Sequence, residues 1–202
     1  MAARVIPFED SDTVQNISIT ATDAIPEGCI LTALQNSVTF TNNNASSPVS
    51  IAFNPTGILT DISNLTAGST SAAQAMPASA SVNYYVTVGG VVTPNGPYAI
   101  QSGNGFMVVT VSGGIGSETV SPDPVAIPLG GNLEMQPAVS THVYNVAWTD
   151  GDPFTVPITT ADSTSHTDNS SDGTGEYPYT VTRVSIEGGG GKGGGKVIVV
   201  GT

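Results

Sequence analysis

Charge of either sign is scarce in this chain of 202 residues. Charged residues make up 10% of it, against about 25% in average soluble proteins. The basic residues are only Arg4, Arg183, Lys192 and Lys196, and the net charge is −12. Nucleic-acid binding needs Lys and Arg to neutralise phosphates, and anionic membranes attract basic clusters. The composition therefore argues against nucleic-acid and membrane partners, and the acidity itself is typical of a solubilising surface.

Cysteine pairs and long apolar runs are also missing. Cys29 is the only cysteine, which excludes an intrachain disulfide. The opening "MAARVIPFED" has no apolar core of signal-peptide length. No stretch approaches the roughly 20 apolar residues of a membrane span. We expect a chain that is made and kept in a cytosol, or a secreted chain whose signal has been removed.

Helical periodicity is nearly absent, and β-prone runs take its place. Runs such as "SVTFT", "VSIAF", "VNYYVTV", "GFMVVTV" and "HVYNVAW" alternate with turn clusters, as they do in antiparallel sandwiches. The candidate for a short helix is "STSAAQAM" (69–76), which would end before Pro77. The sequence predicts an all-β protein built of antiparallel Greek-key β-sandwiches similar to the immunoglobulin fold.

The two halves of the chain show the same order of segments, which indicates an internal repeat. "NSVTFTNNNASSPVSIAF" (36–53) and "GNLEMQPAVSTHVYNVAW" (131–148) both read as strand, turn, strand, aromatic. "PYAIQSGNGFMVVTV" (97–111) and "YPYTVTRVSIEGGGGKGGGKVIVV" (177–200) both run from a Tyr and a strand through a Gly-rich turn to a Val-rich strand. We therefore place an N-terminal arm at 1–13, a sandwich domain at 14–113, a Gly- and Pro-rich linker at 114–121 and a second sandwich domain at 122–202.

The first half resembles the cupredoxin family, the blue-copper β-sandwiches. "IPEGCILTALQNSVTFTNNNASSPVSIAF" (25–53) and the closing segment 97–111 carry the likeness, which extends more faintly to the second half. The resemblance implies a cupredoxin-like sandwich, in tandem. In that family a histidine after the Asn-rich turn binds copper, together with a cysteine, a second histidine and often a methionine from the closing segment.

The ligands that such a copper centre needs do not carry over to this chain. A blue-copper site requires a Cys thiolate and two His imidazoles. Pro48 stands at the first histidine position, and the closing segment of the first half offers only Met107. In the second half His142 falls near the first histidine position, but the closing strand lacks a cysteine. With Cys29 on an early strand, we expect no copper and no other cofactor, and we interpret His142 as an ordinary polar residue.

Oxygen-bearing side chains gather in one loop of the second half. The segment "TTADSTSHTDNSSDGTGE" (159–176) holds Asp162, Asp168, Asp172, Glu176 and His166. Loops of this composition can hold calcium, although the spacing matches no EF-hand. A solvated loop is the prediction, and calcium binding by Asp162, Asp168 and Asp172 is an alternative that the sequence leaves open.

Two further patterns do not point to catalysis. "EGGGGKGGGK" (187–196) lacks the Gly-Lys-Ser/Thr of a phosphate-binding loop, because Lys192 is followed by Gly193. It is typical of a flexible hairpin loop. His142 and His166 are the only imidazole bases, and neither lies in a recognisable nucleophile motif. We therefore expect a protein that is not an enzyme, with no catalytic, cofactor-binding or metal-binding residues to name.

This content predicts a non-enzymatic structural protein of a virus particle, namely a capsid decoration or surface-projecting subunit made in the host cytoplasm. The partner would be another copy or the major shell protein. Val5, Ile6 and Phe8 of the arm are the candidate contact residues. The alternative is a secreted or cell-surface β-sandwich that serves in adhesion or binding. A copper electron-transfer protein is a more remote alternative.

Overall fold

The regular structure of the described residues is entirely β-strand, as the abundance of β-branched residues predicts. The computed structural model describes residues 14–31, 36–103, 106–128, 131–149, 154–155, 158–161, 165–167, 175–184 and 193–200. The chain divides into two units, of which one spans Ser11–Gly105 and the other contains Phe106–Thr202. We call them the first and the second unit. The prediction of an all-β, sandwich-type fold is confirmed.

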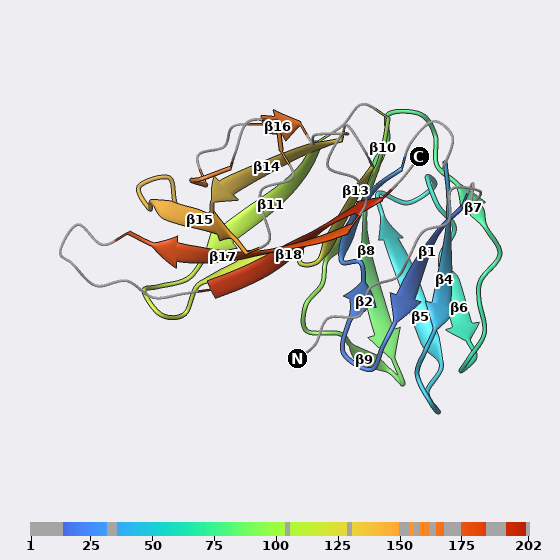
Figure 1. The fold of residues 1–202 in the computed structure, drawn as a ribbon. Helices are drawn as coiled ribbons and strands as arrows, with labels where there is room; N and C mark the ends of the chain where they lie inside the picture. Colours follow the sequence, from blue (N-terminus) through green and yellow to red (C-terminus); the bar gives the residue numbers. More distant parts are fainter. Residues whose placement is uncertain are drawn as a thin grey trace. The chain divides into compact units, whose positions relative to one another are not determined.

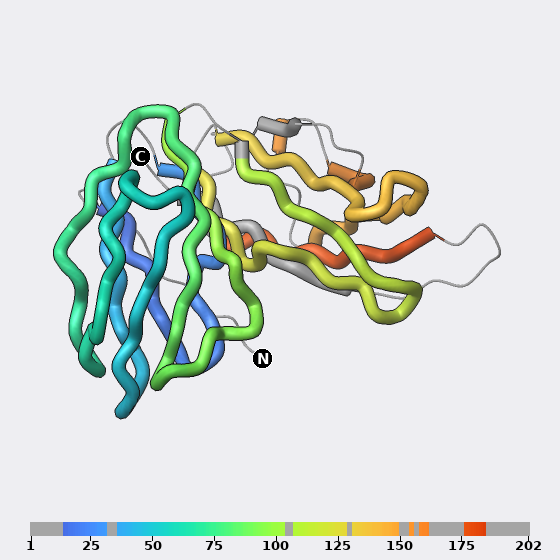
Figure 2. Tube along the Cα trace, turned by 180° about the vertical axis from the view of Figure 1, so that it is seen from behind, coloured from blue at the N-terminus to red at the C-terminus, as the bar shows by residue number. Residues whose placement is uncertain are grey.

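Two sheets form the first unit. One has the order β2-β1-β4-β7 and the other β3-β10-β8-β5-β6, with β9 paired to β8. Figure 1 shows β1 and β4 lying over β5 and β8, and Figure 2 shows the same layers from behind. The strands are β1 (Val14–Ile19), β2 (Ala24–Ile25), β3 (Gly28–Leu31), β4 (Ser37–Asn42), β5 (Val49–Asn54), β6 (Ile62–Leu65), β7 (Gln74–Ala75), β8 (Ser81–Val88), β9 (Val91–Val92) and β10 (Tyr98–Ser102).

Alternating burial fixes which face of each strand enters the core of the first unit. β4 and β8 bury every second side chain, as a half-buried strand with a two-residue period must. Phe40 of β4 contacts Phe53 of β5 and Tyr84 of β8, with ring centroids 5.7 and 5.3 Å apart. These aromatic contacts join the two sheets, so the core lies between them.

The second unit is also built from two sheets. Their orders are β12-β11-β14-β16 and β13-β18-β17-β15. Val109 and Met135 of the first sheet and Tyr144 and Val181 of the other are buried. The strands are β11 (Phe106–Ser112), β12 (Thr119–Ser121), β13 (Val125–Pro128), β14 (Asn132–Pro137), β15 (Tyr144–Trp148), β16 (Ser165–Thr167), β17 (Gly175–Arg183) and β18 (Gly193–Val200).

The two units repeat one strand connectivity. β1 runs parallel to β4 as β11 does to β14, and β3 runs parallel to β10 as β13 does to β18. The other strand pairs described within each unit are antiparallel, so the sheets are mixed. The predicted match of 36–53 with 131–148 corresponds to β4–β5 and β14–β15. The predicted match of the closing segments, 97–111 with 177–200, is wrong by one strand. It paired β10 with β17, whereas the strand orders show that β8 corresponds to β17 and β10 to β18.

The predicted boundary between the domains needs correction. The strand Phe106–Ser112, which the sequence assigned to the first sandwich, pairs with β12 and β14 of the second unit. The predicted linker at 114–121 is instead the turn of the β11–β12 hairpin and the strand β12 itself. The local sequence pattern of Phe106–Ser112 predicts a strand whichever unit it belongs to. Only its pairing partners show that it belongs to the second unit.

The short helix predicted at 69–76 does not form. Thr70 bridges to Thr41, and Gln74–Ala75 pairs with β4 as strand β7. The backbone N–H of Ser71 donates to the carbonyl of Phe40 at 2.9 Å, so the segment hydrogen-bonds to its neighbour strand. In the described part of the chain no helix has the length and apolarity needed to cross a membrane. The predicted arm, 1–13, lies outside the described residues.

Candidate functional site

Three segments meet at one end of the second unit, which we call the loop end. They are the β11–β12 turn, the β14–β15 turn and the end of β17. Glu118 joins two of them, because its carboxylate Oε1 accepts the backbone N–H of Arg183 at 3.0 Å and Oε2 accepts that of Gly116 at 3.1 Å. Glu118 and Arg183 are 65 residues apart in sequence. The carboxylate therefore fastens the hairpin turn to the other sheet.

The surroundings of Glu118 favour its charged form. Burial by itself would raise the pKa of this carboxyl group. The backbone N–H groups of Arg183, Glu118 and Gly116 and the charge of Arg183 outweigh that effect, so the pKa lies below its ordinary value. Glu118 is therefore ionised at neutral pH, which rules it out as a proton donor there and makes it a structural acceptor.

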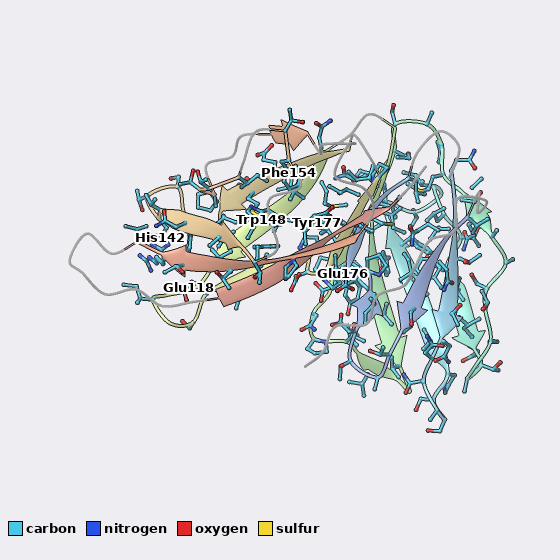
Figure 3. The ribbon with its side chains drawn as sticks, in the orientation of Figure 1. Glu118, His142, Trp148, Phe154, Glu176 and Tyr177 are labelled. Carbon is cyan, nitrogen blue, oxygen red and sulfur yellow. The ribbon has the colours of Figure 1, made fainter. Side chains whose placement is uncertain are left out.

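Tyr144, the first residue of β15, links the β14–β15 turn to the β11–β12 turn. Its hydroxyl donates to the carbonyl of Gly113 at 3.0 Å, and His142 Nδ1 lies 3.3 Å from that hydroxyl. Gly113 has φ +94°, and a Cβ there would lie 2.2 Å from the carbonyl oxygen of Ser117. Only glycine fits this position. Figure 3 shows His142 and Glu118 at this end of the unit.

Aliphatic side chains project from these fastened segments. They are exposed by 46% at Ile115, 46% at Val139, 53% at Val143 and 42% at Val184. The N–H of Val184 donates to the carbonyl of Val143 at 2.8 Å, and that of His142 to Val139, also at 2.8 Å. We call these four residues the aliphatic rim. Sequence reasoning missed it, and the available signal was single aliphatic residues within polar turns ("GGIGS", "AVSTHV").

The equivalent end of the first unit is closed by a different side chain. Asn42 is fully buried, and its Nδ2 donates to the carbonyls of Ser47 and Leu65 at 2.9 and 2.8 Å. Its Oδ1 accepts the N–H of Asn44 at 2.9 Å. At this end the exposed aliphatics are Val91 and Val92, at 71% and 59%. In this chain the Asn42 side chain, at the start of the Asn-rich turn, thus binds neighbouring backbone segments together.

The residues that the copper comparison matched to ligand positions belong to different units. Pro48 follows the Asn-rich turn of the first unit, and its carbonyl accepts the N–H of Gly89 at 3.0 Å. Met107 lies on β11 of the second unit and is buried, as is Cys29 on β3 of the first. Burial raises the pKa of the Cys29 thiol to about 12, which disfavours the thiolate that copper requires. His142 contacts Tyr144, as described above.

The predicted oxygen-rich loop is only partly described. Asp162, Asp168 and Asp172 lie outside the described residues, whereas His166 lies on β16 and Glu176 on β17. Residues 187–192 of the Gly-rich loop also lie outside, and Gly193–Lys196 begins β18. Within the described ranges, no group of three or more His, Cys, Asp or Glu side chains is placed to hold a metal ion. The calcium alternative stays a prediction.

Replacing Glu118 with glutamine is expected to lower stability at neutral pH and to flatten its pH dependence in acid. The folded-state pKa is depressed, so the wild-type contribution is present above the unfolded-state value of about 4.3 and disappears as pH falls through the folded value. Urea midpoints of wild type and Glu118→Gln should therefore differ at pH 7 and converge as the pH falls through the folded-state pKa of Glu118. A difference between the two urea midpoints that stays constant with pH would contradict this role of Glu118.

Comparisons with known proteins add little to this geometry. No family model and no curated protein matches the chain. Among solved structures, the ectodomain of human desmocollin-1 is similar at 12% identity with a TM-score of 0.23. The match covers 98% of this chain and 39% of that chain. The chain thus spans well under half of that ectodomain, and a likeness this weak carries no argument about function.

Proposed function

We propose that this chain is a non-enzymatic structural subunit of a virus particle, a capsid decoration or surface-projecting protein that works by binding other proteins. The aliphatic rim is the observation that carries the proposal. Ile115, Val139, Val143 and Val184 are exposed on turns and at a strand end that hydrogen bonds hold in place. Exposed aliphatics on pre-ordered turns suit contact with another protein, because little conformational entropy is lost on binding.

Several polar and aromatic side chains of the described residues have structural tasks. Glu118 and Asn42 bind backbone groups. Trp148, the only tryptophan, donates its Nε1–H to the carbonyl of Ile158 at 3.0 Å and packs on Tyr179 with ring centroids 5.0 Å apart. The Trp148 indole thus packs and hydrogen-bonds within the second unit. This use of the polar and aromatic groups favours a scaffold over a catalyst.

The N-terminal arm would supply the anchor. Ordering a segment costs roughly 1–2 kcal/mol per residue in backbone entropy. Burial of Val5, Ile6 and Phe8 on another protein would contribute on the order of 1.5–3 kcal/mol per side chain. The proposed partner is a neighbouring copy or the major shell protein.

A secreted or cell-surface adhesion module is the second candidate. Both units expose aliphatics at the equivalent end, Val91 and Val92 in the first and Val139 and Val143 in the second. Loops at one end of immunoglobulin-type sandwiches are a common binding surface. This repetition favours a module that binds a partner through its loops.

Fractionation of the native source decides between these candidates. An antibody raised against the purified protein would locate the chain on a density gradient of virions, cell envelopes and soluble extract. We expect it to co-sediment with virions and to remain there after a salt wash, because apolar contacts are not screened by salt. Recovery with the cell envelope would replace the first candidate by the second. Recovery in the soluble fraction alone would overturn both.

A further inference from the structure

An open hollow of about 380 Å³ lies at one side of the first unit. It is placed where β6, the edge strand of one sheet, faces the segment leading into β7, the edge strand of the other. Half-buried Ile62 and Leu65 and exposed Ala72 give it an apolar floor. The lining residues are Thr60, Asp61, Ile62, Leu65, Ser71, Ala72 and Gln74.

Polar groups around the hollow are largely engaged with the sandwich. Gln74 is bound to the backbone of Thr60, since its Oε1 accepts the N–H of Thr60 at 2.6 Å and its Nε2 donates to the Thr60 carbonyl at 2.9 Å. Asp61 Oδ1 accepts the N–H of Phe53 at 2.9 Å, and Ser71 Oγ accepts that of Phe40 at 3.0 Å. The space that remains suits apolar side chains better than a polar ligand.

The edge strand beside the hollow is poorly suited to pairing with a further strand. The register of β5 against β6 shifts between Val49 and Ile51, and Asn64 has φ 54°. Bulges and left-handed residues at a sheet edge disrupt the regular row of backbone groups that strand addition requires. An occupant of the hollow would therefore bind through its side chains.

We propose that the hollow receives the N-terminal arm of a second copy of this chain, with Val5, Ile6 and Phe8 as the inserted side chains. The inference rests on the proposed function, in which the arm binds a neighbour in an assembly. Residues 1–13 precede the first described residue, Val14. An extended chain spans at most about 3.5 Å per residue, so the arm carries Phe8 up to roughly 20 Å from Val14. That reach is enough to cross to an adjacent copy.

Charge complementarity supports the same occupant. Asp61 is exposed and lines the hollow. Arg4, one of four basic residues in a chain with sixteen acidic ones, directly precedes Val5 and Ile6. An arm that inserts its apolar residues therefore brings the guanidinium of Arg4 toward the carboxylate of Asp61, which lines the hollow. The acidic residues of the arm, Glu9 and Asp10, follow on the other side of Phe8.

Photo-crosslinking between full-length copies tests the proposal. Protein with p-benzoylphenylalanine in place of Phe8 is made in light and in ¹⁵N-labelled form, mixed and irradiated, and the crosslinked peptides are read by mass spectrometry. We expect crosslinks to segments 60–65 and 71–74 that join light and heavy chains. Ala72→Trp fills the hollow and should lower their yield at least about tenfold, whereas Ala52→Trp on the exposed face of β5 should not. Asp61→Asn keeps an acceptor for Phe53 and should lower the yield a few-fold at low salt.

Several results would overturn the inference. Crosslinks within single chains only would place the arm on its own copy. Crosslinks to other surfaces, or a yield that neither Ala72→Trp nor Asp61→Asn alters, would exclude the hollow. If crosslinks are absent and the chain still co-sediments with virions, the inference fails and the proposed function stands. If the expected crosslinks form but the chain is found only in the soluble fraction, the inference stands and the proposed function fails.

Discussion

Replacing Asn42 with aspartate is expected to lower the free energy of unfolding of the first unit by about 2–5 kcal/mol. Aspartate has nearly the same shape but loses the amide donor. The carbonyls of Ser47 and Leu65 would then face a carboxylate oxygen at a site that is fully buried. Each buried carbonyl left without a donor costs about 1–3 kcal/mol, and the buried charge adds to that cost.

Two optical signals make this measurement specific. Trp148 is the only tryptophan and lies in the second unit, so its fluorescence follows that unit alone. Far-UV circular dichroism follows both units during urea unfolding. The Asn42→Asp change should move the dichroism transition and leave the tryptophan transition in place. Asn83→Asp, at an exposed position of β8, should change stability by less than about 0.5 kcal/mol. Equal losses for the two variants would show that Asn42 has no special structural role.

Deletion of residues 2–12 is expected to remove the protein from particles while leaving both units folded. Burial of Val5, Ile6 and Phe8 would contribute several kcal/mol at about 1.5–3 kcal/mol per side chain. Loss of about 4 kcal/mol reduces affinity roughly a thousandfold. Incorporation would be measured as the amount of subunit per major shell protein in purified particles. The dichroism and tryptophan transitions would be measured on the same preparations.

The matched control for the deletion separates apolar contact from charge. Replacing Glu9, Asp10 and Asp12 by their amides removes charge and keeps Val5, Ile6 and Phe8. This variant should incorporate close to the wild-type level. A truncated chain that still incorporates at full occupancy would rule out the arm as the anchor. Misfolding of the truncated chain would instead show that the arm belongs to the fold.

Sequence patterns predicted the strands well and their partners less well. Alternating runs such as "SVTFT" and "VNYYVTV" bury one face, so a two-residue period identifies them directly. The strand Phe106–Ser112 was also identified, but it was placed in the wrong unit because pairing with β14 leaves no local signature. The Ala-rich segment 69–76 has helical propensity, and the edge of β4 overrides it.

The loop end was harder to predict, for a related reason. Glu118 looked like part of a linker because Gly and Ser surround it. Its function depends on the N–H of Arg183, 65 residues away. His142 was expected to be an ordinary polar residue, and it contacts Tyr144. Backbone partners of side chains are set by tertiary structure, and a single sequence carries little information about them.

The repeated connectivity of the two units has an evolutionary consequence. The strand order is duplicated, but the residues that close the equivalent ends are not. Asn42 on β4 closes one unit, whereas Glu118 of the β11–β12 turn and Tyr144 of β15 close the other. An ancestral single-unit gene that was copied would have kept its framework while each copy acquired its own fasteners. Substitutions among the closing residues of one unit then leave the closing residues of the other unit unchanged. In a repeated framework of this kind, the residues that close one unit can change without any change in those that close the other.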